Sequence, residues 1–64
     1  MKTDEMRLGL GVQKANFSSK DVSIEGVITR QEKDEDGNLL PIFYVTWSDG
    51  TETLAIPQKL NARS

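Results

Sequence analysis

Two Asp-Gly pairs separate segments rich in β-branched and aromatic residues, and they constrain the fold of this chain more than any other feature. The first pair, at 36–37, lies between residues 22–30 and 39–47, and the second, at 49–50, separates residues 42–47 from residues 51–56. Asp-Gly between alternating apolar and polar residues is typical of a two-residue hairpin turn, because both central residues need positive φ angles. The sequence therefore predicts three consecutive antiparallel strands.

A two-residue turn at the second Asp-Gly pair specifies which residues face one another across that hairpin. The predicted pairs are Ser48 with Thr51, Trp47 with Glu52, Val45 with Leu54, and Phe43 with Ile56. Residues that are paired across two strands share one face of the sheet. We therefore expect an apolar face of Phe43, Val45, Leu54 and Ile56 with Trp47 at its end, and a more polar face of Tyr44, Thr46, Thr53 and Ala55.

The first Asp-Gly pair, treated in the same way, predicts the same buried face. It pairs Ile28 with Val45 and Gly26 with Trp47, so that Ile28 joins the core without adjustment. This agreement between two independent turns supports the predicted core. The same register sets Arg30 opposite Phe43 on the core face, which a β-bulge, or a ribbon that extends beyond the core, would relieve. Pro41 cannot donate a ladder hydrogen bond, so we expect it at an edge or a bulge nearby.

A chain of 64 residues predicts a single domain, with residues 1–7 as a flexible lead-in. Leu10 and Val12 alternate with glycines, and we expect a first strand near 10–16 followed by a loop at 18–21. Proline suits the first position of a helical turn, which we predict near 57–60, with Leu60 folding back onto the core. Residues 61–64 are expected to add a brief last strand or to fray.

The order of these elements resembles the SH3-like small barrels, among them the Tudor, chromo-barrel and KOW-type domains. The resemblance covers about residues 8–61 and is carried by Tyr44-Val45-Thr46-Trp47-Ser48-Asp49-Gly50 and by Gly26-Val27-Ile28. The adjacent Tyr and Val depart from the spacing common in those families. The resemblance implies an all-β, SH3-like small barrel of about five mostly antiparallel strands, with a short helical turn near 57–60. Those families bind methylated peptides, proteins or nucleic acids, and a fold does not decide among these functions.

Composition argues against catalysis and against a cofactor. The chain has no cysteine and no histidine, which excludes disulfides, zinc sites built on sulfur or imidazole, and the commonest catalytic bases. The acidic run of Glu32, Asp34, Glu35 and Asp36 lacks the order of a calcium-binding loop, so we predict a solvated hairpin tip and no metal. No apolar run approaches the ~20 residues that span a membrane, and we expect a cytoplasmic protein.

The aromatic residues offer a candidate ligand site. Tyr44 and Trp47, beside Asp49 and Glu52, could form a partly acidic pocket for a cationic side chain through cation–π attraction. In the alternative interpretation, which we favour, Trp47 closes the end of a thin core and Tyr44 covers a hairpin.

Two kinds of macromolecular partner remain. Leu39, Leu40 and Ile42 lie partly outside the predicted core face, where an apolar strip would bind a protein. We therefore predict a non-catalytic small interaction module for a protein partner or for itself, such as an accessory protein of a bacterium or phage, with no small-molecule substrate. The alternative is a nucleic-acid-binding domain, for which Lys14, Lys20, Arg30, Lys59 and Arg63 would have to converge. The net charge of −2, with four acids and one base in residues 31–38, disfavours it.

Overall fold

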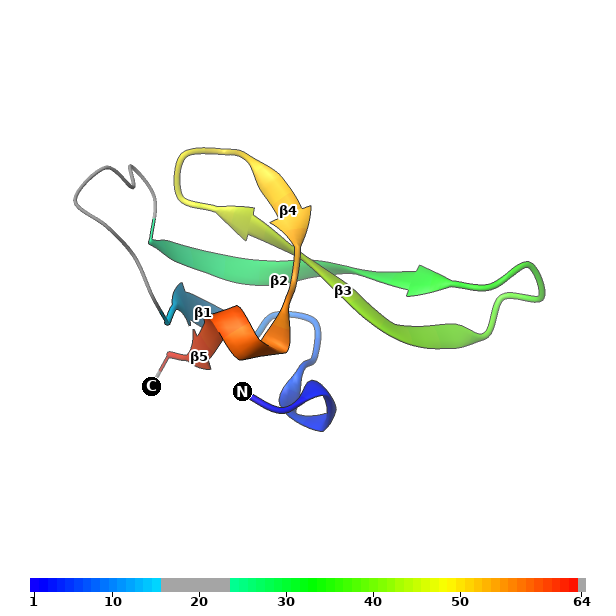
Figure 1. Ribbon diagram of the computed structural model, residues 1–64. Coiled ribbons are helices and arrows are strands. Elements are labelled where there is room, and N and C mark those ends of the chain that lie inside the picture. Colours follow the sequence, from blue (N-terminus) through cyan, green and yellow to red (C-terminus); the bar gives the residue numbers. More distant parts are fainter. Residues whose placement is uncertain (16–23, 64) are drawn as a thin grey trace.

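The computed structural model describes residues 1–15 and 24–63 and contains one antiparallel sheet of five strands (Figure 1). The strands are β1 (Gly11–Lys14), β2 (Glu25–Lys33), β3 (Leu39–Trp47), β4 (Glu52–Leu54) and β5 (Leu60–Ala62), in the spatial order β4-β3-β2-β1-β5. Two 3₁₀ turns, η1 (Thr3–Glu5) and η2 (Pro57–Lys59), are the helical elements of the described residues. The predicted all-β class with five antiparallel strands is confirmed. Within the described ranges β4 and β5 do not pair with each other, so the sheet is not closed into a barrel.

The two long strands extend beyond the rest of the sheet. β1 pairs only with the first residues of β2, and β4 pairs only with residues 44–46 of β3. The distal parts of β2 and β3 and their loop, residues 32–41, therefore project as a two-stranded ribbon, here called the arm (Figure 1). The molecule measures 42 × 22 × 17 Å. It exposes 4568 Å², whereas about 4,100 Å² is typical of a compact monomer of its mass.

Both hairpin loops contain three residues, so the predicted two-residue turns are wrong. At the second loop Trp47 N–H donates to the Thr51 carbonyl (2.8 Å) and Gly50 N–H donates to the Trp47 carbonyl (2.9 Å). Gly50 has a φ of +92° and Gly37 a φ of +83°, while no described residue other than glycine has a positive φ. This is the three-residue loop in which glycine alone takes the left-handed conformation.

Aspartate side chains stabilise the three-residue loops. Asp34 Oδ1 accepts hydrogen bonds from Asp36 N–H and Asn38 N–H, both at 2.9 Å. Asp49 Oδ1 accepts from the Thr51 hydroxyl at 2.7 Å and from Thr51 N–H at 3.0 Å. The bonds from Asn38 lower the pKa of Asp34, and those from Thr51 lower the pKa of Asp49, because each favours the ionised carboxylate.

The extra loop residue shifts the β3–β4 register by one position. The observed pairs are Tyr44 with Leu54, Val45 with Thr53, and Thr46 with Glu52. The predicted pairs of Val45 with Leu54 and of Phe43 with Ile56 are therefore wrong. Because side chains alternate between faces, a shift of one residue turns every side chain of β4 over. Leu54 and Ile56 are 50% and 38% exposed, and Ala55 is buried in their place.

The first hairpin keeps the predicted register near the core. Ile28 pairs with Val45 and Gly26 with Trp47, as predicted. Two irregularities in the pairing of β2 with β3 compensate for the extra loop residue, so that the predicted register is restored near the core. The first is at Pro41, where three residues of β3 lie opposite the single residue Glu32 of β2. The second is at Thr29, an extra residue in β2, which brings Arg30 opposite Tyr44. The predicted bulge is confirmed, and it removes Arg30 from the core face.

The core is small and combines residues from all parts of the described chain. Its buried members are Met6, Val12, Ile28, Phe43, Val45, Trp47, Ala55 and Leu60, and Met1 and Leu10 pack against them. The predicted helical turn is confirmed as η2, and Leu60 folds back onto the core as expected. Residues 1–7, expected as a flexible lead-in, contain η1 (Thr3–Glu5), and Met6 among them lies in the core. The expected first strand is observed at 11–14, and the expected loop at 18–21 lies outside the described residues.

Candidate functional site

Apolar side chains gather on the face of β2, β3 and β4 that points away from the core, here called the outer face. Tyr44 and Leu54 are a cross-strand pair on this face. Ala55 N–H donates to the Phe43 carbonyl (2.8 Å), so the same register continues and sets Ile56 opposite Ile42. Ile42 is 39% exposed. These four residues, Ile42, Tyr44, Leu54 and Ile56, form what we call the apolar block.

A polar network borders the apolar block on its β2 side. The Arg30 guanidinium lies 4.0 Å from the centre of the Tyr44 ring and forms an ion pair of 3.0 Å with Glu52. The Tyr44 hydroxyl donates to Glu32 Oε2 at 3.1 Å. The network holds the Tyr44 ring in place across the sheet, so the ring faces an internal cation rather than open solvent.

The Tyr44 phenol provides a direct test of this network. Its hydrogen bond to Glu32 raises the pKa of Tyr44, because the bond favours the protonated hydroxyl, and partial burial adds to the shift. We expect the phenol pKa to lie above its ordinary value and Glu32→Gln to bring it back towards that value. Tyr44 is the single tyrosine, so absorbance at alkaline pH reports it alone. Glu35→Gln, at the exposed loop, is the control, and an equal shift in both variants would contradict the contact.

Trp47 lies on the core side of β3, away from the apolar block. It is 7% exposed, and its indole N–H donates to the Thr53 hydroxyl at 2.7 Å. Lys14 Nζ lies 5.1 Å from the centre of its ring. Of the four residues predicted to form one aromatic pocket, Tyr44 and Glu52 are brought together, whereas Trp47 lies on the opposite face and Asp49 stabilises its own loop.

Among the described residues, the cations proposed for nucleic acid do not all lie on one face of the sheet. Arg30 lies on the outer face, paired with Glu52, whereas Lys14 lies on the core side over Trp47. Lys59 is close to β1, since its carbonyl accepts from Ala15 N–H at 2.9 Å. Lys20 lies outside the described residues. The described cations are therefore divided between two faces of the sheet.

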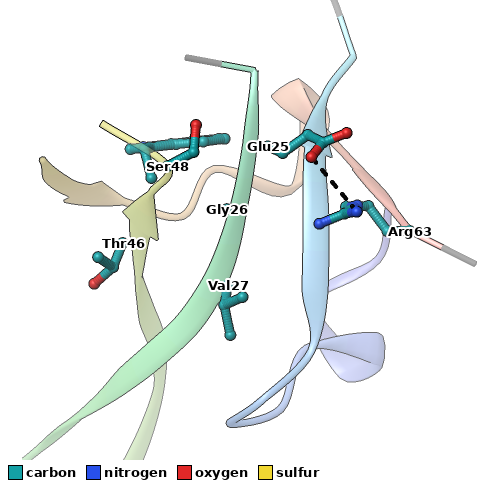
Figure 2. Close-up of a pocket in the computed structure, with 7 residues that line it drawn as sticks. Glu25, Gly26, Val27, Thr46, Ser48 and Arg63 are labelled. Atoms are coloured by element: carbon teal, nitrogen blue, oxygen red, sulfur yellow. Dashed lines mark ion pairs between the residues drawn. The ribbon is translucent and has the colours of Figure 1, made fainter. Parts of the chain in front are cut away.

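A shallow pocket lies on the outer face, at the end of the sheet opposite the arm (Figure 2). Its volume is about 150 Å³, and its lining comprises Glu25, Gly26, Val27, Thr46, Trp47, Ser48 and Arg63. Arg63, which follows β5, reaches across to Glu25 of β2 with an N–O distance of 3.5 Å. Sequence reasoning missed this pocket because it depends on the pairing of β1 with β5, two strands that are far apart in the chain.

Gly11 explains how Arg63 reaches the pocket. Arg63 N–H donates to the Gly11 carbonyl at 2.9 Å, which continues the β1–β5 ladder by one pair. A side chain at position 11 would contact Arg63 Cβ and Cδ at 3.6 and 3.7 Å, so the Arg63 side chain lies over the bare backbone of Gly11. A glycine in a strand often marks such a close approach.

Neither a metal site nor a membrane segment is found in the part of the chain that the structure describes. Residues 1–15 and 24–63 hold no group of three or more possible metal ligands, the acidic arm included. Within the same ranges no helix has the length and apolar character needed to cross a bilayer.

Comparisons of the chain with protein-family models, with curated proteins and with solved structures found no match. The function is therefore inferred from the surface and the fold.

Proposed function

We propose that this chain is a non-catalytic small interaction module that binds a protein partner through its outer face and arm. The apolar block is the observation that carries the proposal. Single exposed apolar side chains are common on protein surfaces, whereas a contiguous exposed group on one face marks an interaction site. Ile42, Leu54 and Ile56 lie around Tyr44, and each is more than a third exposed. They are not members of the buried core on the other side of the sheet.

The arm supports the same proposal. A two-stranded ribbon is at best marginally stable in water, and it gains stability when another surface covers it. Leu39 on the arm is 61% exposed, and Leu40 beside it is partly buried. Pro41 and the two bulges interrupt the strand edges, which disfavours the addition of another strand. We therefore expect the arm to bind through its side chains.

The topology supports an SH3-like small barrel as the finer description of the fold. β1 lies between β2 and β5, and a single 3₁₀ turn, η2, joins the short β4 to β5. This element order is the one on which the resemblance rests. A solution structure in which the two sheet edges curve towards each other would establish the barrel.

Paired variants of exposed residues test the proposed function. The double variant Leu54→Ser, Ile56→Ser removes two of the four apolar side chains of the apolar block. The control Leu8→Ser removes an apolar side chain that is 57% exposed and lies before β1. The measurement is quantitative cross-linking in the source cell, with copies of the chain itself counted as partners. We expect the yield of protein adducts to fall at least about tenfold in the double variant and to stay unchanged in Leu8→Ser.

Two outcomes would contradict the proposal. The first is an identical set of adducts for wild type, the double variant and Leu8→Ser. The second is a salt-dependent gel shift with nucleic acid that leaves no protein adducts, which would favour the alternative of a nucleic-acid-binding domain.

A further inference from the structure

We infer that the protein partner binds by strand addition, with an extended peptide segment of it pairing along the free edge of β4. The inference rests on the proposed function, because it states how the partner of the outer face is bound. β4 is one of the two edge strands of the sheet (Figure 1). An edge strand presents backbone N–H and C=O groups with which an extended segment of another chain can pair.

The ladder between β3 and β4 determines which backbone groups point to this edge. Ala55 N–H donates to the Phe43 carbonyl at 2.8 Å, so these two residues form a hydrogen-bonded pair. Hydrogen-bonded and non-hydrogen-bonded pairs alternate along an antiparallel ladder, so the pairs made by Leu54 and Glu52 are non-hydrogen-bonded. The N–H and C=O of Leu54 and of Glu52 therefore point away from β3, and they have no backbone partner among the described residues.

The opposite edge of the sheet, at β5, is less open. Arg63 N–H donates to the Gly11 carbonyl, so the same alternation directs the backbone groups of Leu60 and Ala62 to that edge. The amino group of Met1 donates to the Leu60 carbonyl at 3.3 Å, and Leu60 is buried. Part of the β5 edge is therefore covered, whereas every residue of β4 is exposed.

The length of the β4 edge suits a peptide segment rather than a second sheet. The hydrogen bond of Ala55 continues the ladder beyond β4, so the edge runs over residues 52–56. It ends at Pro57, which begins η2 and cannot donate a hydrogen bond. Short edges resist pairing with long strands of other sheets. We therefore expect a single short extended segment at this edge.

The side chains beside the edge specify alternating apolar residues in that segment. Leu54 and Ile56 lie on the outer face next to the edge and are 50% and 38% exposed. Directly opposed side chains of neighbouring strands have Cβ atoms about 4.5–5.5 Å apart. Apolar side chains at alternate positions of an added strand would therefore cover both residues and extend the apolar block. Backbone pairing then supplies affinity, and the alternate side chains supply specificity.

Charge at the start of the edge specifies one end of the segment. Residues 49–56 carry two acids, Asp49 and Glu52, and no base. Glu52 is paired with Arg30, whereas the Asp49 carboxylate accepts hydrogen bonds only within its own loop. The bonds from Thr51 lower the pKa of Asp49 and keep it ionised at neutral pH. A lysine or arginine of the partner is therefore expected beside this loop.

Backbone methylation tests the edge without changing any side chain. A chain of 64 residues is accessible to chemical synthesis. N-methylation of Leu54 removes an N–H that points to the edge and leaves the bonds between β3 and β4 in place. N-methylation of Ala62 makes the same change on the β5 edge and is the matched control. Circular dichroism is expected to show that both methylated chains are folded.

The probe is the acetylated and amidated peptide Lys-Val-Thr-Val-Thr-Val-Lys, in which valine and threonine alternate. We expect a dissociation constant below about 1 mM for the native chain, and a rise of at least about tenfold after N-methylation of Leu54 only. With the peptide at about ten times this constant, hydrogen exchange of the Glu52 and Leu54 amides is expected to slow about tenfold. The control peptide Lys-Val-Val-Val-Thr-Thr-Lys has the same composition without the alternation and is expected to bind at least about tenfold more weakly.

Three results would overturn strand addition at β4. They are the absence of binding at millimolar peptide, binding that protects neither amide, and equal effects of the two N-methylations. Protection of the same amides that rises with the concentration of the chain alone would overturn it in favour of a second copy. Protein adducts that are lost in Leu54→Ser, Ile56→Ser but retained after N-methylation of Leu54 would remove strand addition and leave the proposed function standing.

Discussion

Trp47→Ala is expected to leave the protein unfolded at room temperature. Trp47 is 7% exposed and closes the end of a core that has only eight buried members among the described residues. Truncation of a buried tryptophan costs about 3–5 kcal/mol through lost transfer free energy and the cavity left behind. A single hydrophobic core in a chain of 64 residues rarely supplies more than about 3–5 kcal/mol of stability. The substitution therefore removes most of the margin or all of it.

Trp47→Phe is the matched control. It keeps an aromatic ring in the core and removes the five-membered ring of the indole, together with the N–H that donates to the Thr53 hydroxyl. We expect it to stay folded and to lose about 1–2 kcal/mol. Circular dichroism and the dispersion of amide proton resonances are suitable measurements, because both variants lack the single tryptophan. A fully folded Trp47→Ala variant would instead favour the hypothesis of a ligand-binding rim.

Gly26→Ala is expected to be the most destabilising single-methyl change in the chain. A Cβ at position 26 would lie 2.5 Å from Val45 Cγ1 and 2.9 Å from both the Thr46 carbonyl oxygen and Trp47 Cε3. The carbonyl belongs to the adjacent strand and the ring is buried, so neither can move freely. Overpacking of this kind costs about 1–3 kcal/mol. Urea unfolding of Gly26→Ala and of the wild type measures this loss in the free energy of unfolding.

Gly11→Ala provides the comparison within the same sheet. Position 11 has ordinary contacts of 3.6 and 3.7 Å with Arg63, and its φ is not positive. We therefore expect a change within about 1 kcal/mol, with a small gain if the lower entropy of the unfolded chain dominates. Equal destabilisation at positions 11 and 26 would contradict the packing of Gly26 under Trp47.

The first hairpin shows how much of the fold local patterns predict. Ile28 and Val45 are both fully buried and paired as predicted. The conflict between Arg30 and the core face was visible in the sequence, and the bulge that resolves it lies where it was expected. Such features are predictable because alternation over nine residues leaves only one register that buries the apolar side chains.

The candidate site was predictable only in part. Ile42 and Tyr44 were expected outside the core face, and both belong to the apolar block. Leu54 and Ile56 were expected inside, because the predicted turn was one residue too short. The signal for the longer loop was present in the sequence, since Asp49 precedes Thr51 by two residues and its carboxylate can accept hydrogen bonds from that residue.

Residue patterns alone specify the strand class, the two hairpins, the bulge near Pro41 and the turn at η2, because each of these depends on neighbours along the chain. The tertiary structure decided the pairing of β1 with β5, the burial of Met6 and the position of Arg63 over Gly11. These contacts join segments that are far apart in sequence, and many alternative pairings of such segments share the same local pattern. The Asp-Gly turns show the same dependence on tertiary structure, because the length of the second loop decides which face of β4 is buried and leaves Leu54 and Ile56 exposed.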